Sequence, residues 1–382
     1  MAESRFHTAA RVGALFGLWW LILQAFAILV SNRFQLAGQD TAYSWLGQTR
    51  LAKTEGWSGF VNLHNRWDSG FYVWIAQDGY VRDTAAFLPL YPACIRLGAL
   101  VWGALTRDEA DENVYAAAAF VVSNLSALGA AVGLYALARL DLDETGAQQA
   151  LFYFLIFPTA FFLTAIYTEA LFVFWAILSF YAARRRWWAL AGGAGACAAL
   201  TRVAGLGLFP ALLIEWRLER RAYPWKWAWL LLIPLAFAAY ELYLRSQNLS
   251  FFVSQQEVFG RWPLNPLALP DNIEWAHLQT HPMAQAHRAL EAGLGALTLI
   301  AAFMAGRRMR LSYGLFSSLC ILGPLSTGTL LGLERFALTA FPTFLLLARY
   351  RPLAWLDRAY TLGAILLLAL YTLLFVHGYW AG

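Results

Sequence analysis

The sequence contains little charge for its length. Only 13% of its 382 residues are Asp, Glu, Lys or Arg, whereas 60% are hydrophobic and the mean hydropathy is +0.51. Soluble domains carry about 25% charged residues, so this composition excludes a water-soluble fold. The net charge of +5 is scattered in short clusters and forms no basic groove, which argues against nucleic acid as a partner.

Cysteine is also scarce. Cys94, Cys197 and Cys320 all lie in apolar runs, and no two of them form a C-x-x-C pair. This pattern predicts buried thiols and gives no support for disulfides or cysteine metal ligands. The sequence also lacks a repeat of fixed period and a low-complexity tract.

Long apolar runs are abundant, and 18 Trp and 17 Tyr are available for the membrane interfaces. We therefore expect an all-α, polytopic membrane protein, with residues 1–382 forming one transmembrane domain of about eleven spans. The expected spans are 12–30, 114–138, 148–165, 169–183, 187–203, 204–216, 226–244, 288–306, 311–326, 335–349 and 360–377.

The apolar run 87–105 is ambiguous because it carries Pro89, Pro92 and Arg96. The positive-inside rule resolves it: if this run does not cross, four arginine clusters fall on the same side as Arg5 and Arg11 at the N-terminus. We therefore expect a cytoplasmic N-terminus and an interfacial helix over 87–105. The four clusters are 184–186, 217–226, 307–310 and 349–358.

Two long polar segments then share the outer face: a first loop over 31–113 with juxtamembrane helices, and a second loop over 245–287. Water-facing chemistry is expected there, chiefly in the first loop. His277, His281 and His287 in the second loop have loosely metal-like spacing, but Pro282 interrupts the helix and no acidic or Cys ligand completes the set. We expect no metal and no other cofactor.

The segment 65–80 mixes charge with aromatic side chains beside the membrane. As a helix it would place Asp68 and Tyr72 on one face, with Trp67 on the lipid or protein side. A purely structural interpretation is equally available: an interfacial helix with Asp68 as its cap and Arg66 as a snorkelling anchor.

Several motifs resemble the PIG-V (phosphatidylinositol-glycan class V) mannosyltransferase family. The first is Arg66-Trp67-Asp68, and the second runs from Ala86 through Leu88-Pro89 to Pro92. Later segments follow in the family's order, so the likeness covers most of the chain. They are Phe157-Pro158, Ala165 to Leu171, Leu200-Thr201-Arg202, Glu334-Arg335-Phe336 and Phe341-Pro342.

The resemblance implies a glycosyltransferase of the GT-C superfamily, which takes sugar from a polyprenyl-phosphate donor on the outer or lumenal face. It also implies an acidic catalytic base in the first outer loop, which is Asp68 here. Phe71 and Asp78 stand where eukaryotic members tend to have histidines. The acceptor therefore need not be a glycosylphosphatidylinositol precursor.

The chemistry independently requires one carboxylate. A polyprenyl phosphate leaves without a general acid, whereas the acceptor hydroxyl must lose a proton as it attacks the anomeric carbon. The leaving phosphate needs fixed positive charge, for which Arg202 and Arg335 are the candidates. Each arginine could instead pair with Glu169 or Glu334 for packing alone.

Further substrate contacts are expected from side chains around these motifs. Tyr167 and Glu169 would bind sugar hydroxyls beside an outer turn, and His64 would contact the acceptor or lie on the surface. The full set of expected substrate-binding residues is His64, Arg66, Trp67, Tyr72, Tyr167, Glu169 and Glu334.

The leading hypothesis is an inverting mannosyltransferase that moves mannose from a polyprenyl-phosphate donor to a lipid or glycolipid hydroxyl on the outer membrane face. The alternatives are a lipid-linked sugar transporter or flippase, and a non-catalytic assembly subunit. Polar residues gathered at one depth of the membrane favour the enzyme over a transporter, whose polar residues would line the full thickness.

Overall fold

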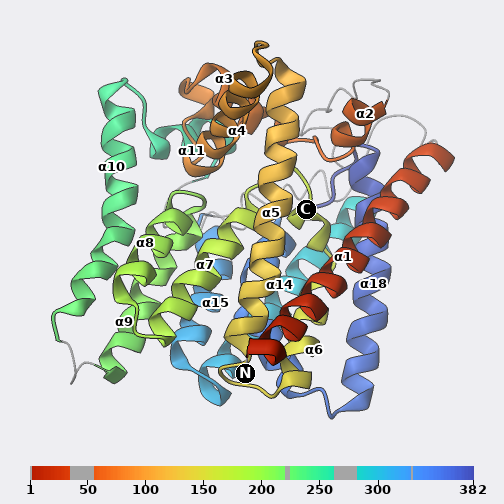
Figure 1. Ribbon diagram of the computed structural model, residues 1–382, viewed down its shortest axis with the longest axis vertical. Helices are drawn as coiled ribbons and strands as arrows, with labels where there is room; N and C mark the ends of the chain where they lie inside the picture. The colour runs from red at the N-terminus through yellow and green to blue at the C-terminus, as the bar shows by residue number, and fades with distance from the viewer. Residues whose placement is uncertain (1, 35–55, 220–223, 262–281, 328–329) are drawn as a thin grey trace.

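The protein is an all-helical bundle in a computed structural model that describes residues 2–34, 56–219, 224–261, 282–327 and 330–382, and no strand occurs among them (Figure 1). Its helices are α1 (Ala2–Arg33), α2 (Gly56–Asn62), α3 (Ser69–Asp78), η2 (Arg82–Thr84), α4 (Leu90–Thr106), α5 (Glu112–Ala138), α6 (Glu144–Leu155), η3 (Ala160–Leu163), α7 (Glu169–Arg184), α8 (Trp188–Ala199), η4 (Val203–Gly207), α9 (Leu208–Glu219), η5 (Lys226–Leu231), α10 (Leu232–Ser246), α11 (Phe251–Phe259), α14 (Pro282–Arg308), α15 (Leu311–Leu325), α16 (Leu333–Thr339), α17 (Pro342–Arg349) and α18 (Ala354–Val376).

Among the described residues, five helical segments are long and apolar enough to cross a membrane. Each has 21 or more residues, or about 30 Å of helix at 1.5 Å per residue, which matches the hydrocarbon core. These segments are Ala10–Arg33, Glu112–Ala138, Lys226–Ser246, Gln285–Arg308 and Ala354–Val376.

The remaining expected spans are shorter or broken in the structure. The run 148–165 divides into α6 and η3, because α6 ends at Leu155 ahead of Pro158. The run 335–349 divides into α16 and α17, and Pro342 starts the second helix. Helices of 8 to 16 residues thus form the buried centre, where protein and not lipid surrounds them.

Small residues let α5 and α7 pack closely at this centre. A Cβ added at Gly129 would lie 2.7 Å from the Phe174 ring, and one at Gly133 would lie 3.0 Å from Ile177. Ala127, Ala130 and Ala131 on α5 are fully buried. Such close approach through small side chains is the usual way in which membrane helices gain packing energy.

The two ends of the bundle differ in what they carry. One end, at the top of Figure 1, holds α2, α3, α4 and α11. The chain is at this end when α1 finishes and still there when α5 begins, so α4 lies across the end of the bundle and does not traverse it (Figure 1). The helix expected over 87–105 is thus observed as α4 at this end of the bundle (Figure 1), and that it does not cross the membrane stays a prediction.

Ion pairs tie arginine clusters together at the opposite end. Arg11 of α1 pairs with Glu144 at 3.4 Å, which brings the start of α1 to the start of α6. Asp141, just before α6, takes two hydrogen bonds from Arg184 at 2.7 and 2.9 Å.

Two further arginine–carboxylate ion pairs lie at this end of the bundle. Arg310 donates to Glu215 at 2.9 Å, and Arg351 donates to Asp143 at 2.7 Å. Members of the 184–186, 307–310 and 349–358 clusters therefore lie at the same end as Arg11, as the topology argument required.

Candidate active site

The Asp68 carboxylate projects from a tight turn ahead of α3. Trp67 adopts a left-handed backbone with φ of 54°, a conformation that is uncommon for a bulky residue and marks local strain. The Tyr167 hydroxyl holds the turn: it donates to the Arg66 carbonyl at 2.9 Å and accepts from the Asp68 N–H at 3.2 Å. Asp68 occupies the N-cap position of α3, yet its side chain makes no capping hydrogen bond, which leaves the carboxylate available.

Arg335 faces this carboxylate from α16. Its Nη1 lies 3.5 Å from Asp68 Oδ2, and its Nε lies 3.1 Å from Glu169 Oε1. The guanidinium carbon sits 5.1 Å from the centre of the Phe162 ring and 5.0 Å from that of Tyr167. Such ring contacts stabilise a cation that has lost much of its water.

Arg202 lies on the other side of Glu169. Its Nη1 donates to Glu169 Oε1 at 2.6 Å and to the Thr168 hydroxyl at 3.0 Å, and its guanidinium lies 4.8 Å from the Phe336 ring centre. Glu169 is fully buried as the first residue of α7, where the helix dipole favours a negative charge. One carboxylate therefore bridges the two candidate phosphate-binding arginines.

Arg261, which follows α11, completes the charged group and was missed from the sequence. It is close enough to Asp68, Arg335 and Arg202 for their charges to act on it, and burial lowers its pKa to about 10. A lone arginine in the long second loop has no spacing partner, so nothing in the sequence linked it to Asp68. Only the fold of α11 back toward α3 reveals the association.

Tyr72 forms part of the aromatic wall behind Asp68. Its ring lies 5.1 Å from Phe87, 5.2 Å from Tyr91 and 6.3 Å from Tyr167. Burial, and then the carboxylates of Asp68 and Glu169, raise the pKa of Tyr72, so its phenol stays protonated and can donate a hydrogen bond.

Trp67 packs edge to face on Trp380, with ring centres 5.4 Å apart. This contact anchors the strained turn to the segment that follows α18. The structure therefore places Trp67 beside Asp68 as a support of the turn.

His64 and Arg66 direct their polar atoms into the protein. His64 Nε2 lies 2.7 Å from Gln24 Oε1, and its Nδ1 lies 3.1 Å from the Phe60 carbonyl. The Arg66 guanidinium donates to carbonyls of the preceding turn and, at 3.1 Å, to that of Val376 at the end of α18. Both residues thus hold the first loop against the bundle, and the substrate contacts expected of them stay predictions.

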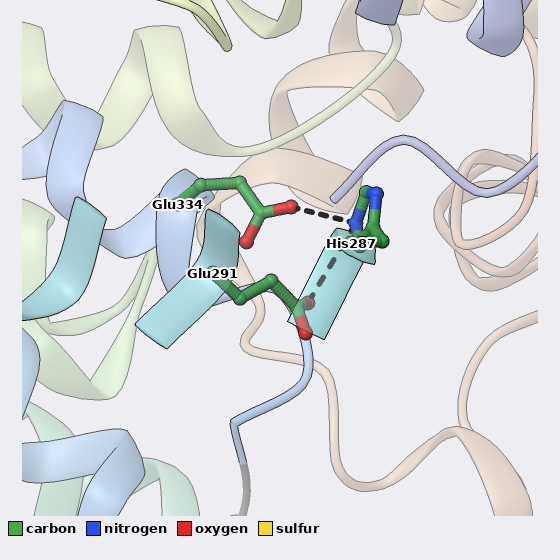
Figure 2. Close-up of side chains that lie close together, drawn as sticks. All are labelled: His287, Glu291 and Glu334. Carbon is green, nitrogen blue, oxygen red and sulfur yellow. Dashed lines mark hydrogen bonds and ion pairs between the residues drawn. The ribbon is translucent and has the colours of Figure 1, made fainter. Parts of the chain in front are cut away.

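Glu334 turns away from the Asp68 group although it is adjacent to Arg335 in sequence. Its Oε1 lies 3.1 Å from His287 Nε2, and its burial is complete (Figure 2). The alternative pairing of Arg335 with Glu334 does not occur, since Arg335 uses Glu169 and Asp68. His277 and His281, which share loosely metal-like spacing with His287 in the sequence, lie outside the described residues.

The resulting group gathers three guanidiniums, from Arg202, Arg261 and Arg335, around two carboxylates, Asp68 and Glu169. One positive charge is therefore in excess, and Glu169, Arg202 and Arg335 are buried. Such a site suits an anion, and Arg335 and Arg202 present planar donors that match phosphate oxygens. The Asp68 side chain, 27% exposed, remains the accessible carboxylate, whereas that of Glu169 is fully enclosed.

The family model described as mannosyltransferase (PIG-V) matches residues 26–262 of this chain. The matched region includes the Asp68 turn, Glu169, Arg202 and Arg261, while α16 with Arg335 lies beyond it. No curated protein matches the sequence.

Solved structures share the fold at low identity. The chain is similar to ArnT from Cupriavidus metallidurans bound to undecaprenyl phosphate, at 12% identity and a TM-score of 0.50, over 95% of this chain and 76% of ArnT. It is also similar to the Archaeoglobus fulgidus oligosaccharyltransferase tethered to an acceptor peptide, at 14% identity and a TM-score of 0.43, over 95% of this chain and 55% of that protein. The protein thus has the GT-C glycosyltransferase fold.

Proposed function

Because the chain belongs to the PIG-V mannosyltransferase family, we propose that it transfers mannose from a polyprenyl-phosphate donor to a hydroxyl of a lipid or glycolipid. The observation that carries the proposal is the pairing of one accessible carboxylate, Asp68, with Arg335, whose Nη1 lies 3.5 Å from it. A base and a phosphate-binding cation are the two groups that this transfer requires.

The excess positive charge around Glu169 supports a phosphate-linked donor. A polyprenyl phosphodiester carries one negative charge, which equals the excess left by three arginines and two carboxylates. Arg335 and Arg202 would bind its oxygens, and Arg261 would add charge from the side of α11. ArnT was captured with undecaprenyl phosphate, a lipid of the same chemical class.

The reaction follows from these positions. Asp68 accepts the proton of the acceptor hydroxyl while the hydroxyl oxygen bonds to the anomeric carbon of mannose. The bond from that carbon to the phosphate oxygen breaks, its electron pair stays on the phosphate, and the arginines stabilise the charge. Attack opposite the leaving group inverts the centre, so a β-linked donor gives an α-linked product.

The contact between Asp68 and Arg335 also suggests an order of events. Without donor, Arg335 partly neutralises the carboxylate that must act as base. A donor phosphate would draw the Arg335 guanidinium toward itself and leave Asp68 free to take a proton. The base would then be most active once the donor is in place, which limits futile hydrolysis.

The proposed location is a multi-pass protein with its N-terminus in the cytoplasm and the Asp68 site on the outer or lumenal face. The arginine clusters that gather with Arg11 favour that orientation. The first loop, 31–113, would supply the base and the second loop, 245–287, would help to enclose the substrates. The transfer step needs no metal ion, since the arginines provide the positive charge.

The decisive experiment uses purified protein in detergent with synthetic polyprenyl-phosphate mannose and a membrane lipid extract. Formation of a mannosylated lipid with an α linkage, established by mass spectrometry and α-mannosidase digestion, supports the proposal. Intact donor that moves across proteoliposome membranes without transfer would instead support the transporter alternative. A well-folded protein that neither transfers mannose nor moves the donor across the membrane would favour an assembly subunit.

A further inference from the structure

A second buried polar cluster lies one residue along α16 from Arg335 and takes no part in the proposed reaction. It consists of His287 and Glu291, one turn apart on α14, and Glu334 on α16 (Figure 2). His287 Nε2 lies 3.1 Å from Glu334 Oε1 and 4.0 Å from Glu291 Oε1. His287 is 8% exposed and both glutamates are fully buried.

Two polar atoms at this cluster have no hydrogen-bond partner within the part of the chain that the structure describes. They are Glu334 Oε2 and the hydroxyl of Tyr371, a fully buried residue of α18. The Tyr371 ring lies 5.5 Å from that of His287, and the charges of Glu334 and Glu291 both act on its hydroxyl. A buried oxygen without a partner costs about 1–3 kcal/mol, more when charged, so these atoms indicate a missing ligand.

We propose that His287, Glu291 and Glu334 bind a divalent transition-metal ion, with Zn²⁺ as the best-suited species. Zinc takes imidazole nitrogen and carboxylate oxygen at about 2.0–2.2 Å, so two ligand atoms of one ion lie no more than about 4.4 Å apart. The separations of 3.1 and 4.0 Å from His287 Nε2 fall within this limit. An imidazole ligand favours Zn²⁺ over Mg²⁺ or Ca²⁺, which prefer oxygen alone.

Neighbouring groups already orient the ligands. Glu291 Oε1 accepts from the Gly332 N–H at 2.8 Å, and Glu291 Oε2 accepts from Arg288 Nη1 at 2.7 Å. Gly332 provides this N–H from a left-handed backbone with φ of 74°, which a residue with a side chain rarely adopts. Contacts of this kind fix ligand orientation around metal ions. Glu334 Oε2 and the Tyr371 hydroxyl, which have no described hydrogen-bond partner, are available to the ion or to a further oxygen ligand on it.

The bound ion would act as a clamp between α14 and α16. Glu334 and Arg335 are consecutive in α16, so a fixed Glu334 also fixes the helix that presents Arg335. This positioning role is distinct from the sugar transfer, and metal binding itself does not depend on the proposed function. The competing occupant is a proton on His287, which would make an ion pair with the two glutamates.

Metal binding can be measured on the full-length protein in detergent after tag removal and treatment with a chelator. Zn²⁺ is titrated in, unbound metal is removed, and zinc per chain is determined by elemental analysis alongside the unfolding temperature. We expect about one tightly bound Zn²⁺, a rise in unfolding temperature by linkage, and no comparable effect of Mg²⁺.

Variants locate the ion. His287→Asn and Glu334→Gln should lose the tight zinc, and Arg288→Gln should weaken it about 10- to 100-fold through the orientation of Glu291. His377→Asn, at the end of α18 and away from the cluster, is the matched control and should retain it. Zinc retained by both His287→Asn and Glu334→Gln would place the ion elsewhere and overturn the proposal.

X-ray absorption of the wild-type zinc complex keeps the test decisive should the variants fail to fold. One imidazole nitrogen with oxygen ligands at about 2.0–2.2 Å supports the site. A wild-type protein that binds no zinc after chelation would establish the protonated His287 ion pair in its place.

Discussion

The Asp68 carboxylate and the Arg335 guanidinium, 267 residues apart in the chain, face each other with Oδ2 and Nη1 separated by 3.5 Å. Hydrogen bonds between charged groups are usually about 2.7–2.9 Å long, so this contact is loose. Glu169 holds Arg335 more closely, at 3.1 Å. Asp68 can therefore lose its arginine contact without leaving Arg335 unpaired.

Asp68→Asn should abolish most turnover while the protein stays folded. The substitution preserves size but removes the basic oxygen, and loss of a general base costs about 10²- to 10⁴-fold in rate. A capping role would predict the opposite, but the Asp68 side chain makes no capping bond. Turnover is measured with polyprenyl-phosphate mannose, and folding by the unfolding temperature. Asp78→Asn, exposed at the far end of α3, serves as the control, and Asp68→Asn turnover within about threefold of wild type would rule out the base.

Arg202→Gln and Arg335→Gln should each raise the KM for the donor about 10- to 100-fold, because a hydrogen bond to a charged group contributes about 1.5–3 kcal/mol. The KM for the acceptor should change much less. Donor titrations at saturating acceptor provide the measurement, with Arg335→Lys as a milder second variant.

Arg349→Gln, exposed in the last turn of α17, is the matched control for these arginines. Should both site variants keep the wild-type donor KM and turnover, the arginines serve only to pair with Glu169. The phosphate assignment would then be wrong.

His64 should make the protein less stable as the pH falls below neutrality. Burial, partly offset by the Phe60 carbonyl and assisted by Arg66, lowers the pKa of His64 from 6.5 to about 4. A neutral His64 ring can donate its Nδ1–H to the Phe60 carbonyl. Its Nε2 can accept a hydrogen bond from Gln24 if the Gln24 amide is rotated by half a turn, which exchanges its oxygen for the amide nitrogen that has no described partner.

The sign follows from proton binding: the unfolded chain takes up the His64 proton below about pH 6.5, whereas the folded protein does so only near pH 4. The contribution of neutral His64 to the free energy of unfolding is thus fully present above pH 6.5. It is lost as the pH falls toward 4, by about 3 kcal/mol in total. Unfolding temperatures from pH 7.5 to 4.5 should show a steeper decline for wild type than for His64→Gln. Parallel curves for the two proteins would show that the pKa of His64 does not differ between the folded and unfolded states.

Cysteine labelling should place the two ends of α5 on opposite sides of the membrane. Asp108, ahead of α5, and Thr145, in the first turn of α6, are both exposed. In a background without Cys94, Cys197 and Cys320, an impermeant maleimide added outside should label Asp108→Cys in intact cells. Thr145→Cys should react only after permeabilisation, and equal reactivity of the two sites would contradict the topology.

The sequence alone determined that this is a helical membrane protein and which enzyme family it belongs to. Low charge and long apolar runs require a membrane bundle whatever its packing, because such a composition does not remain soluble. The charge parity around 87–105 predicted that this helix does not cross the membrane, and the structure places α4 at the same end of the bundle as α2, α3 and α11 (Figure 1). The order of motifs around Asp68 and Arg202 indicated the PIG-V family, which the family model confirms.

Only the tertiary structure decided which charges meet. Asp68, Glu169, Arg202, Arg261 and Arg335 come from five separate parts of the chain, and no periodicity relates them. Hydropathy likewise merged 148–165 and 335–349 into spans, although prolines break both. Apolarity reports burial equally whether lipid or protein surrounds a helix, so the short central helices, and the polar clusters that they bring together, follow from packing.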